Sequence, residues 1–129
     1  MNKIIVEVSI GELLDKISIL EIKQEKIKDP EKIKFINNEH SILKNQLDNN
    51  VNSDDKLITL FNSLKEINAK LWVIEDDKRQ CEKDKDFGEK FIKLSRDIHF
   101  LNDDRAKIKL EINNHTGSVI KEIKEYTSY

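Results

Sequence analysis

The chain has 129 residues, enough for one domain with a single hydrophobic core, which we expect to span residues 1–129. Charged and hydrophobic residues each make up 37%, and the single Pro, three Gly and single Cys exclude a turn-rich β-sandwich or barrel, a disulfide scaffold and a collagen-like chain. The formal net charge of −2, with both signs interleaved, leaves no large basic surface, so we expect no nucleic-acid partner.

The first predicted element is a short β-strand at residues 3–8, where β-branched Ile and Val dominate. A helix follows at once, because Ser9 and Glu12 have the spacing of a capping box with Ser9 as the N-cap. Apolar residues then recur at helical spacing until Pro30 approaches, and the residue before a proline disfavours helix. We therefore expect this helix over residues 10–28.

Three further helices are predicted, over residues 30–48, 56–84 and 87–115. Their apolar side chains recur in alternating steps of three and four residues, which is the heptad stripe of helices that pack side by side. Gly117 suits the end of the last helix. The tail over residues 118–129 has apolar spacings that fit either another helix or a strand paired with the N-terminal one.

The fold class that follows is all-α. Short connections make successive helices antiparallel, which predicts an antiparallel four-helix bundle or a pair of helical hairpins with coiled-coil-like stripes, preceded by the short strand. At 1.5 Å per residue, the two later helices exceed the first two by about 13 Å. The excess falls at residues 78–88, which are either an end where a partner docks or merely the solvated end of a hairpin.

Arginine is scarce, since the chain has 20 Lys and only three Arg, at positions 79, 96 and 105. This bias is typical of an AT-rich genome, and each surviving arginine is either retained by chance or needed for its planar, bidentate fork.

Arg105 stands on the heptad stripe of the last helix, where an unpaired guanidinium is costly to bury. The candidate carboxylate partners are Asp15, Glu21, Glu66 and Glu75. Arg105 is thus half of an internal ion pair that fixes helix register, an anion-binding group in a cleft, or a side chain that extends to solvent.

The reversal between the two long helices places Glu75 opposite Arg96, with Arg79 one turn from Glu75 on the same helix. These three residues are expected to form one charged cluster. It is either a surface network of little energetic weight or part of a binding site.

Asn102, Arg105 and Lys109 share one face of the last helix, and all three donate hydrogen bonds. Such a face suits a phosphate or carboxylate if it lines a cleft, and is satisfied internally if it faces the first helix. The candidate ligand-binding residues are Glu12, Asp15, Glu21, Glu75, Arg79, Arg96, Asn102, Arg105 and Lys109.

Patterns typical of catalysis are weak. Glu12 and Asp15 have the Glu-x-x-Asp spacing, and Glu122 and Glu125 the Glu-x-x-Glu spacing, with which helical nucleotide pyrophosphohydrolases hold Mg²⁺, but the fuller Glu-Glu-x-x-Glu form is missing. No His/Cys pair has metal-ligand spacing, and neither a phosphate loop nor a nucleophile–base pair stands out. We predict no metal site and no cofactor, and we favour a non-enzymatic role while leaving activity open.

Several long motifs resemble a known family. They are VEVSIGELLDKISILEIKQEKI at residues 6–27, LWVIEDD at 71–77, KDFGEKFIKL at 85–94 and LNDDRAKIKLEIN at 101–113. Together they resemble a family of small uncharacterised bacterial proteins carried as a domain of unknown function. The resemblance implies a stand-alone helical protein, with no assigned activity and no catalytic residues to transfer. The candidate residues to which the resemblance draws attention are Glu12, Asp15, Glu21, Glu75, Asn102 and Arg105 within the motifs and Arg79 just after the second motif.

The leading hypothesis is a cytoplasmic helical binding or interaction module, because apolar stripes beyond the need of one bundle can be buried by a second copy or a protein partner. The alternative is a protein that binds a small anionic ligand, or a metal-dependent enzyme acting on a phosphorylated small molecule, at a cleft formed by Arg105, Asn102 and the carboxylates of the first helix. No apolar run approaches about 18 residues and no signal peptide is recognisable, so we expect a cytoplasmic location without membrane binding.

Overall fold

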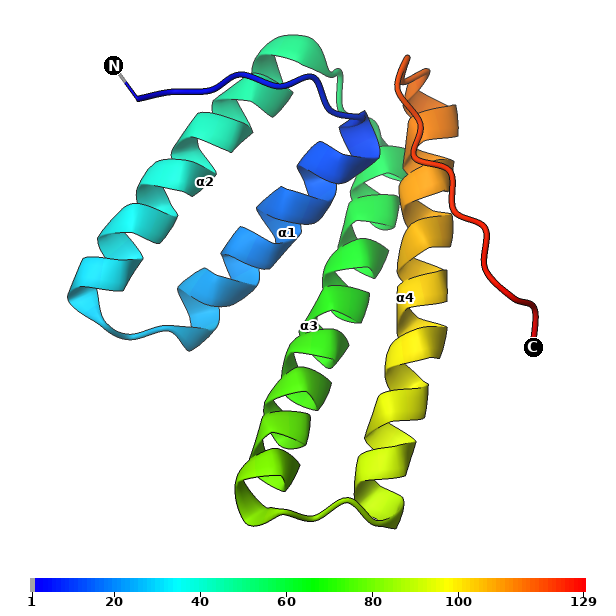
Figure 1. Ribbon diagram of the computed structural model, residues 1–129. Coiled ribbons are helices and arrows are strands. Elements are labelled where there is room, and N and C mark those ends of the chain that lie inside the picture. The colour runs from blue at the N-terminus through cyan, green and yellow to red at the C-terminus, as the bar shows by residue number, and fades with distance from the viewer. Residues whose placement is uncertain (1) are drawn as a thin grey trace.

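The computed structural model describes residues 2–129 and contains four consecutive helices (Figure 1). They are α1 (Ile10–Lys26), α2 (Pro30–Asn50), α3 (Asp55–Asp84) and α4 (Glu89–Thr116). The all-α fold class is therefore confirmed, and every helix end lies within two residues of the end expected from the sequence.

The predicted N-terminal strand is wrong. Within residues 2–129 no strand is present, and residues 3–8 run outstretched across one end of α1 and α2 with their side chains exposed (Figure 1). A β-branched sequence favours strand only where a neighbouring strand accepts its hydrogen bonds. The tail over residues 118–129 supplies no such neighbour, because it is neither helix nor strand and follows α4 on the other side of the molecule.

The helix ends follow from local side-chain chemistry. Ser9 accepts a hydrogen bond from the Glu12 amide, and Asp29 accepts one from the Glu31 amide just ahead of Pro30 in the first turn of α2. Gly117 ends α4 in the left-handed conformation, with a φ of 67° that a side chain would disfavour. These caps explain why the sequence locates the helices closely.

The helices are not packed as a symmetrical bundle. α3 and α4 form a long antiparallel hairpin and α1 lies against both, whereas α2 packs only against α1 among the described helices (Figure 1). The main core lies between α1, α3 and α4 and consists of Leu14, Leu57, Leu60, Leu64 and Ile112. With one neighbour only, α2 buries a single residue, Ile36, which is still 9% exposed, and leaves Phe35 73% exposed.

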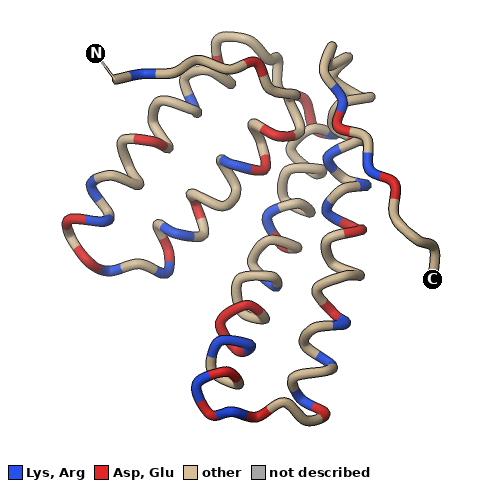
Figure 2. The backbone as a smooth tube through the Cα atoms, in the orientation of Figure 1, with Lys and Arg blue, Asp and Glu red and all other residues tan. Residues whose placement is uncertain are grey.

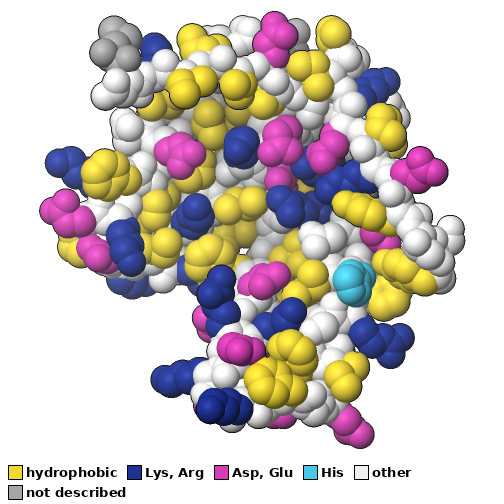
Figure 3. Space-filling view, viewed as in Figure 1, with side chains coloured by type: hydrophobic (Ala, Val, Ile, Leu, Met, Phe, Trp, Pro, Cys, Tyr) yellow, Lys and Arg dark blue, Asp and Glu magenta, His cyan; other side chains and the backbone are white. Residues whose placement is uncertain are grey.

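The α3–α4 hairpin projects beyond α1 and α2, as expected from helix lengths, and reverses between Asp84 and Glu89 (Figure 1). Acidic and basic residues alternate on this projecting end (Figure 2), and apolar side chains lie among them (Figure 3). No helix that the structure describes is both long enough and apolar enough to cross a membrane.

Candidate functional site

The start of α1 and the second half of α4 are in unusually close contact at Gly11. Its amide donates a 2.7 Å hydrogen bond to the side-chain oxygen of Asn113. A Cβ atom at position 11 would lie only 2.6 Å from the backbone oxygen of Lys109. Glycine is therefore required here for the two backbones to approach, and this approach sets which α4 residues face the next turn of α1.

One turn further along α1, Asp15 is buried, with only 1% of its surface exposed. Arg105 donates to it through Nε at 2.9 Å and through a terminal nitrogen at 2.5 Å, the fork geometry of a strong charge-assisted pair. Burial raises the pKa of Asp15, but hydrogen bonds from Arg105 and Asn68 and the charges of Arg105 and Lys109 outweigh it. The pKa therefore lies below its usual value of 3.8.

Asn68 of α3 completes the environment of Asp15. Its amide nitrogen donates to the Asp15 carboxylate at 2.8 Å and to the Ser18 hydroxyl at 2.8 Å. The Ser18 hydroxyl in turn donates to the backbone oxygen of Asp15 at 2.8 Å, so it can only accept from Asn68. The nitrogen of the Asn68 amide is thus fixed toward α1, and its oxygen is left on the opposite side.

Lys109 forms a second ionic contact between α4 and α1. Its ammonium donates to Glu12 at 2.6 Å and to Glu122 of the tail at 3.3 Å, and lies 3.9 Å from Asp15. Burial lowers the pKa of Lys109, but the bond to Glu12 and the charges of Asp15 and Glu12 raise it overall above 10.5. Glu12 and Asp15 are therefore each neutralised by a cation of α4.

A pocket of about 420 Å³ opens beside this polar contact, between α1, α3 and α4. Arg105 lies at its boundary: its side chain is 29% exposed although it is paired with Asp15. The pocket is lined by Ile19, Asn68, Leu71, Trp72, Glu75, Asp76, Arg79, Asn102 and Arg105. It therefore combines apolar, aromatic and charged groups, as small-molecule sites commonly do.

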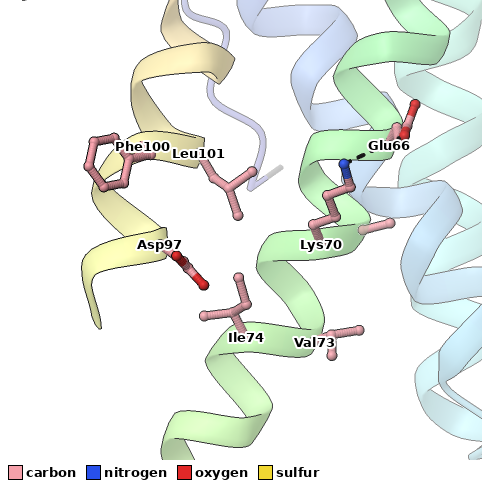
Figure 4. Close-up of a pocket in the computed structure, with 8 residues that line it drawn as sticks. Glu66, Lys70, Val73, Ile74, Asp97, Phe100 and Leu101 are labelled. Carbon is pink, nitrogen blue, oxygen red and sulfur yellow. Dashed lines mark ion pairs between the residues drawn. The ribbon is translucent and has the colours of Figure 1, made fainter. Parts of the chain in front are cut away.

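A second concavity lies on the other face of the α3–α4 hairpin, half a helical turn away from the α3 residues that face α1. This groove has a volume of about 680 Å³ and is mainly apolar. Ile74 of α3 and Leu101 of α4 point toward each other across it, while Lys70 reaches back to Glu66 at 3.6 Å (Figure 4). Its lining residues are Glu66, Ala69, Lys70, Val73, Ile74, Asp97, Phe100 and Leu101.

Comparison with family models shows to which protein family the chain belongs. A model described as a family of unknown function, DUF6165, matches residues 4–129. The chain belongs to the DUF6165 family. Comparison with curated proteins and with solved structures gave no match. The resemblance to a domain of unknown function is thus confirmed, and the functional argument rests on the geometry of the chain itself.

The candidate residues of this DUF6165 chain fall into separate places. Asp15, Glu12 and Lys109 belong to the contact between α1 and α4, and Glu75, Arg79, Asn102 and Arg105 line the pocket. Glu21 lies elsewhere, bonded to His40 of α2 at 3.1 Å and near Lys65 of α3 at 3.4 Å. Arg96 is exposed outside the pocket, and within residues 2–129 no ion pair joins Arg96 or Arg79 to Glu75, so the expected charged cluster of these three residues does not form.

Sequence reasoning missed the uncharged residues Gly11, Asn68 and Asn113. Asn68 follows Leu64 by four residues and precedes Leu71 by three, so it fits the heptad stripe as well as Ile67 does. Asn68 is 5% exposed, whereas Ile67 is only half-buried. Gly11 carried a usable signal as well, since a glycine inside a helix is destabilising unless a close approach requires it.

The Glu-x-x-Asp spacing of Glu12 and Asp15 has a structural use. Both carboxylates bind cationic side chains of α4. In the part of the chain that the structure describes, no group of three or more His, Cys, Asp or Glu side chains is arranged to hold a metal ion.

Proposed function

We propose that this chain is a cytoplasmic helical interaction module that binds a second copy of itself through the groove between α3 and α4. The groove carries the proposal, because it leaves apolar side chains in contact with water. Val73 and Phe100 at its edges are 48% and 47% exposed. Covering them releases about 25 cal/mol for each Å² of apolar surface removed from water. The role proposed is one of association, without a chemical step.

A second α3–α4 hairpin has the shape to fill this groove. A twofold axis parallel to the helices would lay α3 of each copy over α4 of the other, so that all neighbouring helices run antiparallel, as in a four-helix bundle. Residues 66–84 of α3 extend for about 28 Å, and two adjacent helices present a face about 20 Å wide. The pair would bury about 1,100 Å² in total, just above the roughly 1,000 Å² expected of a specific interface. The dimer is therefore expected to form in a concentration-dependent manner.

The charges on the hairpin also favour self-association. Residues 73–100 contain eight acidic and seven basic side chains, so two copies meet with little net repulsion. Lys70 stands on the α3 edge of the groove and Asp97 on the α4 edge. In the twofold arrangement Lys70 of one copy approaches Asp97 of the other, and this contact occurs twice.

The decisive experiment is sedimentation velocity over about a hundredfold range of protein concentration. The mass is expected to rise from monomer to dimer. Phe100→Glu places a charge on the apolar edge of the groove, inside the proposed interface, and is expected to give a monomer at every concentration. Phe35→Glu is the matched control, because Phe35 is also exposed but lies on α2, and it is expected to dimerise like the unchanged chain.

Exchanging the charges of Lys70 and Asp97 tests the twofold arrangement of the two copies. Lys70→Glu is expected to weaken the dimer, and adding Asp97→Lys in the same chain is expected to restore it. A chain that remains monomeric throughout would overturn self-association. A dimer that Phe100→Glu leaves intact, or one that the second charge change fails to rescue, would overturn the proposed surface.

A further inference from the structure

The pocket between α1, α3 and α4 has a composition unlike the rest of the chain. It holds the only Trp and two of the three Arg, but none of the 20 Lys. If its two basic positions were drawn at random from the 23 basic residues, both would be Arg about 1% of the time. The preference for Arg indicates that these positions need a planar fork of donors rather than a positive charge alone.

One end of the pocket presents a fixed acceptor beside a fixed donor. The oxygen of the Asn68 amide accepts no hydrogen bond within residues 2–129, because the amide nitrogen is the atom held by Asp15 and Ser18. The residue is only 5% exposed, and its oxygen is not sealed in the core, since no buried side-chain oxygen of the described residues lacks a partner. Arg105 binds Asp15 through Nε and one terminal nitrogen, which leaves its other terminal nitrogen free to donate toward the pocket. An adjacent acceptor and donor match the edge of a nitrogen heterocycle.

The middle of the pocket supports a flat ring and a sugar. Trp72 lines it together with Leu71 and Ile19, and an indole is a common surface for base stacking. Glu75 follows Trp72 by three residues on α3, and a carboxylate accepts hydrogen bonds from hydroxyl groups. A ring held at Asn68 and Arg105 would therefore direct an attached sugar along α3 toward Glu75.

The far end of the pocket is provided by Arg79, eleven residues beyond Asn68 on α3 and so about 16 Å along the helix axis. Its guanidinium has the geometry that binds phosphate. The charge balance sets how many phosphates fit, because Arg105 is already paired with Asp15, and Glu75 and Asp76 add negative charge. Among the described residues, Arg79 is the one lining cation that no lining or neighbouring carboxylate pairs with, and Glu75 and Asp76 exceed its charge. The pocket therefore holds at most one phosphate group, bound by the fork of donors on Arg79 rather than by net positive charge, and disfavours three.

We propose that this pocket binds a nucleoside monophosphate, with the base at Asn68, Arg105 and Trp72, the ribose at Glu75 and the phosphate at Arg79. The volume of about 420 Å³ lies within the range of small-molecule sites. This site lies on the face of the hairpin opposite the groove proposed for self-association, so the inference does not depend on that function.

Trp72 makes the test direct, because as the only Trp it reports on the pocket through its fluorescence. The full chain is titrated with AMP, GMP, CMP and UMP, and in parallel with adenosine and inorganic phosphate. Saturable quenching by at least one monophosphate is expected, with weaker binding of adenosine and none of phosphate alone. Arg79→Met is expected to weaken monophosphate binding at least about tenfold and to leave adenosine unchanged. Lys83→Met, one turn along α3 and outside the pocket, is the control and is expected to bind like the unchanged chain.

Three results would overturn the inference. One is the absence of saturable quenching by any of the four monophosphates up to about 1 mM, the upper end of ordinary metabolite affinities. Another is equal weakening by Arg79→Met and Lys83→Met, which indicates nonspecific attraction. The third is inorganic phosphate binding as tightly as the monophosphates, which means that the base is not recognised. Circular dichroism melts of both variants establish that each one is folded before its binding is compared.

Discussion

Replacing Arg105 with Met tests the ion pair at the centre of the molecule. Asp15 is 1% exposed, so the variant leaves a carboxylate buried without its main partner. Breaking one half of a buried pair costs about 3–5 kcal/mol. The lower end applies, because Asn68 still donates to Asp15 at 2.8 Å and the Lys109 ammonium lies 3.9 Å away. Urea denaturation followed by circular dichroism is expected to show a loss of about 3 kcal/mol in the free energy of unfolding.

A second substitution separates the free-energy cost of the unpaired buried charge from the cost of the lost packing. Asp15→Asn combined with Arg105→Met removes the charge and keeps an acceptor for Asn68. The double variant is therefore expected to be about 1.5–2 kcal/mol more stable than Arg105→Met alone. Arg96→Met, an exposed arginine on the same helix, is expected to change stability by less than about 0.5 kcal/mol. A loss below about 1 kcal/mol for Arg105→Met, or a double variant no more stable than the single one, would refute the reasoning.

Three further predictions concern pH and the contact of α1 with α4. The folded chain lowers the pKa of Asp15, so this residue stabilises the fold above the unfolded value of 3.8 and loses that contribution as the pH falls through the lower folded value. Urea titrations between pH 4 and pH 2 are expected to show a smaller loss of stability for the double variant than for the unchanged chain. Gly11→Ala is expected to cost about 2 kcal/mol or more in thermal unfolding, because its Cβ would clash with α4, whereas Gly88→Ala meets nothing closer than 3.4 Å and is expected to be tolerated. Asn113→Leu is expected to cost about 1–3 kcal/mol by leaving a buried amide unbonded, while Asn113→Asp, which keeps the acceptor near the start of a helix, is expected to cost less in the same assay.

Helix positions could be predicted because their causes are local. Ser9, Asp29 and Gly117 act on the turn in which they stand, and heptad spacing acts over a few turns. The position of α2 on the outside of α1 could not be predicted, because it depends on which apolar helix faces pack against each other. The strand expected at residues 3–8 failed for the same reason, since a strand requires a distant partner that local preference does not reveal.

The candidate site was predictable in part. A charged residue on an apolar stripe marked Arg105 and required a carboxylate, and Asp15 was one of four possible partners. The sequence could not choose among them, because the register of α1 against α4 is set by the close approach at Gly11. Asn68 was overlooked because an isoleucine beside it fits the heptad equally well, and only the packing of α1 decides which of the two is buried.

The two proposals concern opposite faces of the α3–α4 hairpin, so they can be tested against each other. The groove and the pocket are separated by about the diameter of a helix, roughly 10 Å, and changes at such a distance usually act independently. Phe100→Glu is therefore expected to abolish the dimer and leave the fluorescence response of Trp72 to monophosphates unchanged. Arg79→Met is expected to weaken that response and leave sedimentation unchanged. If Phe100→Glu weakened nucleotide binding as much as Arg79→Met does, the ligand would bind where two copies meet, and its assignment to the pocket of one chain would be wrong.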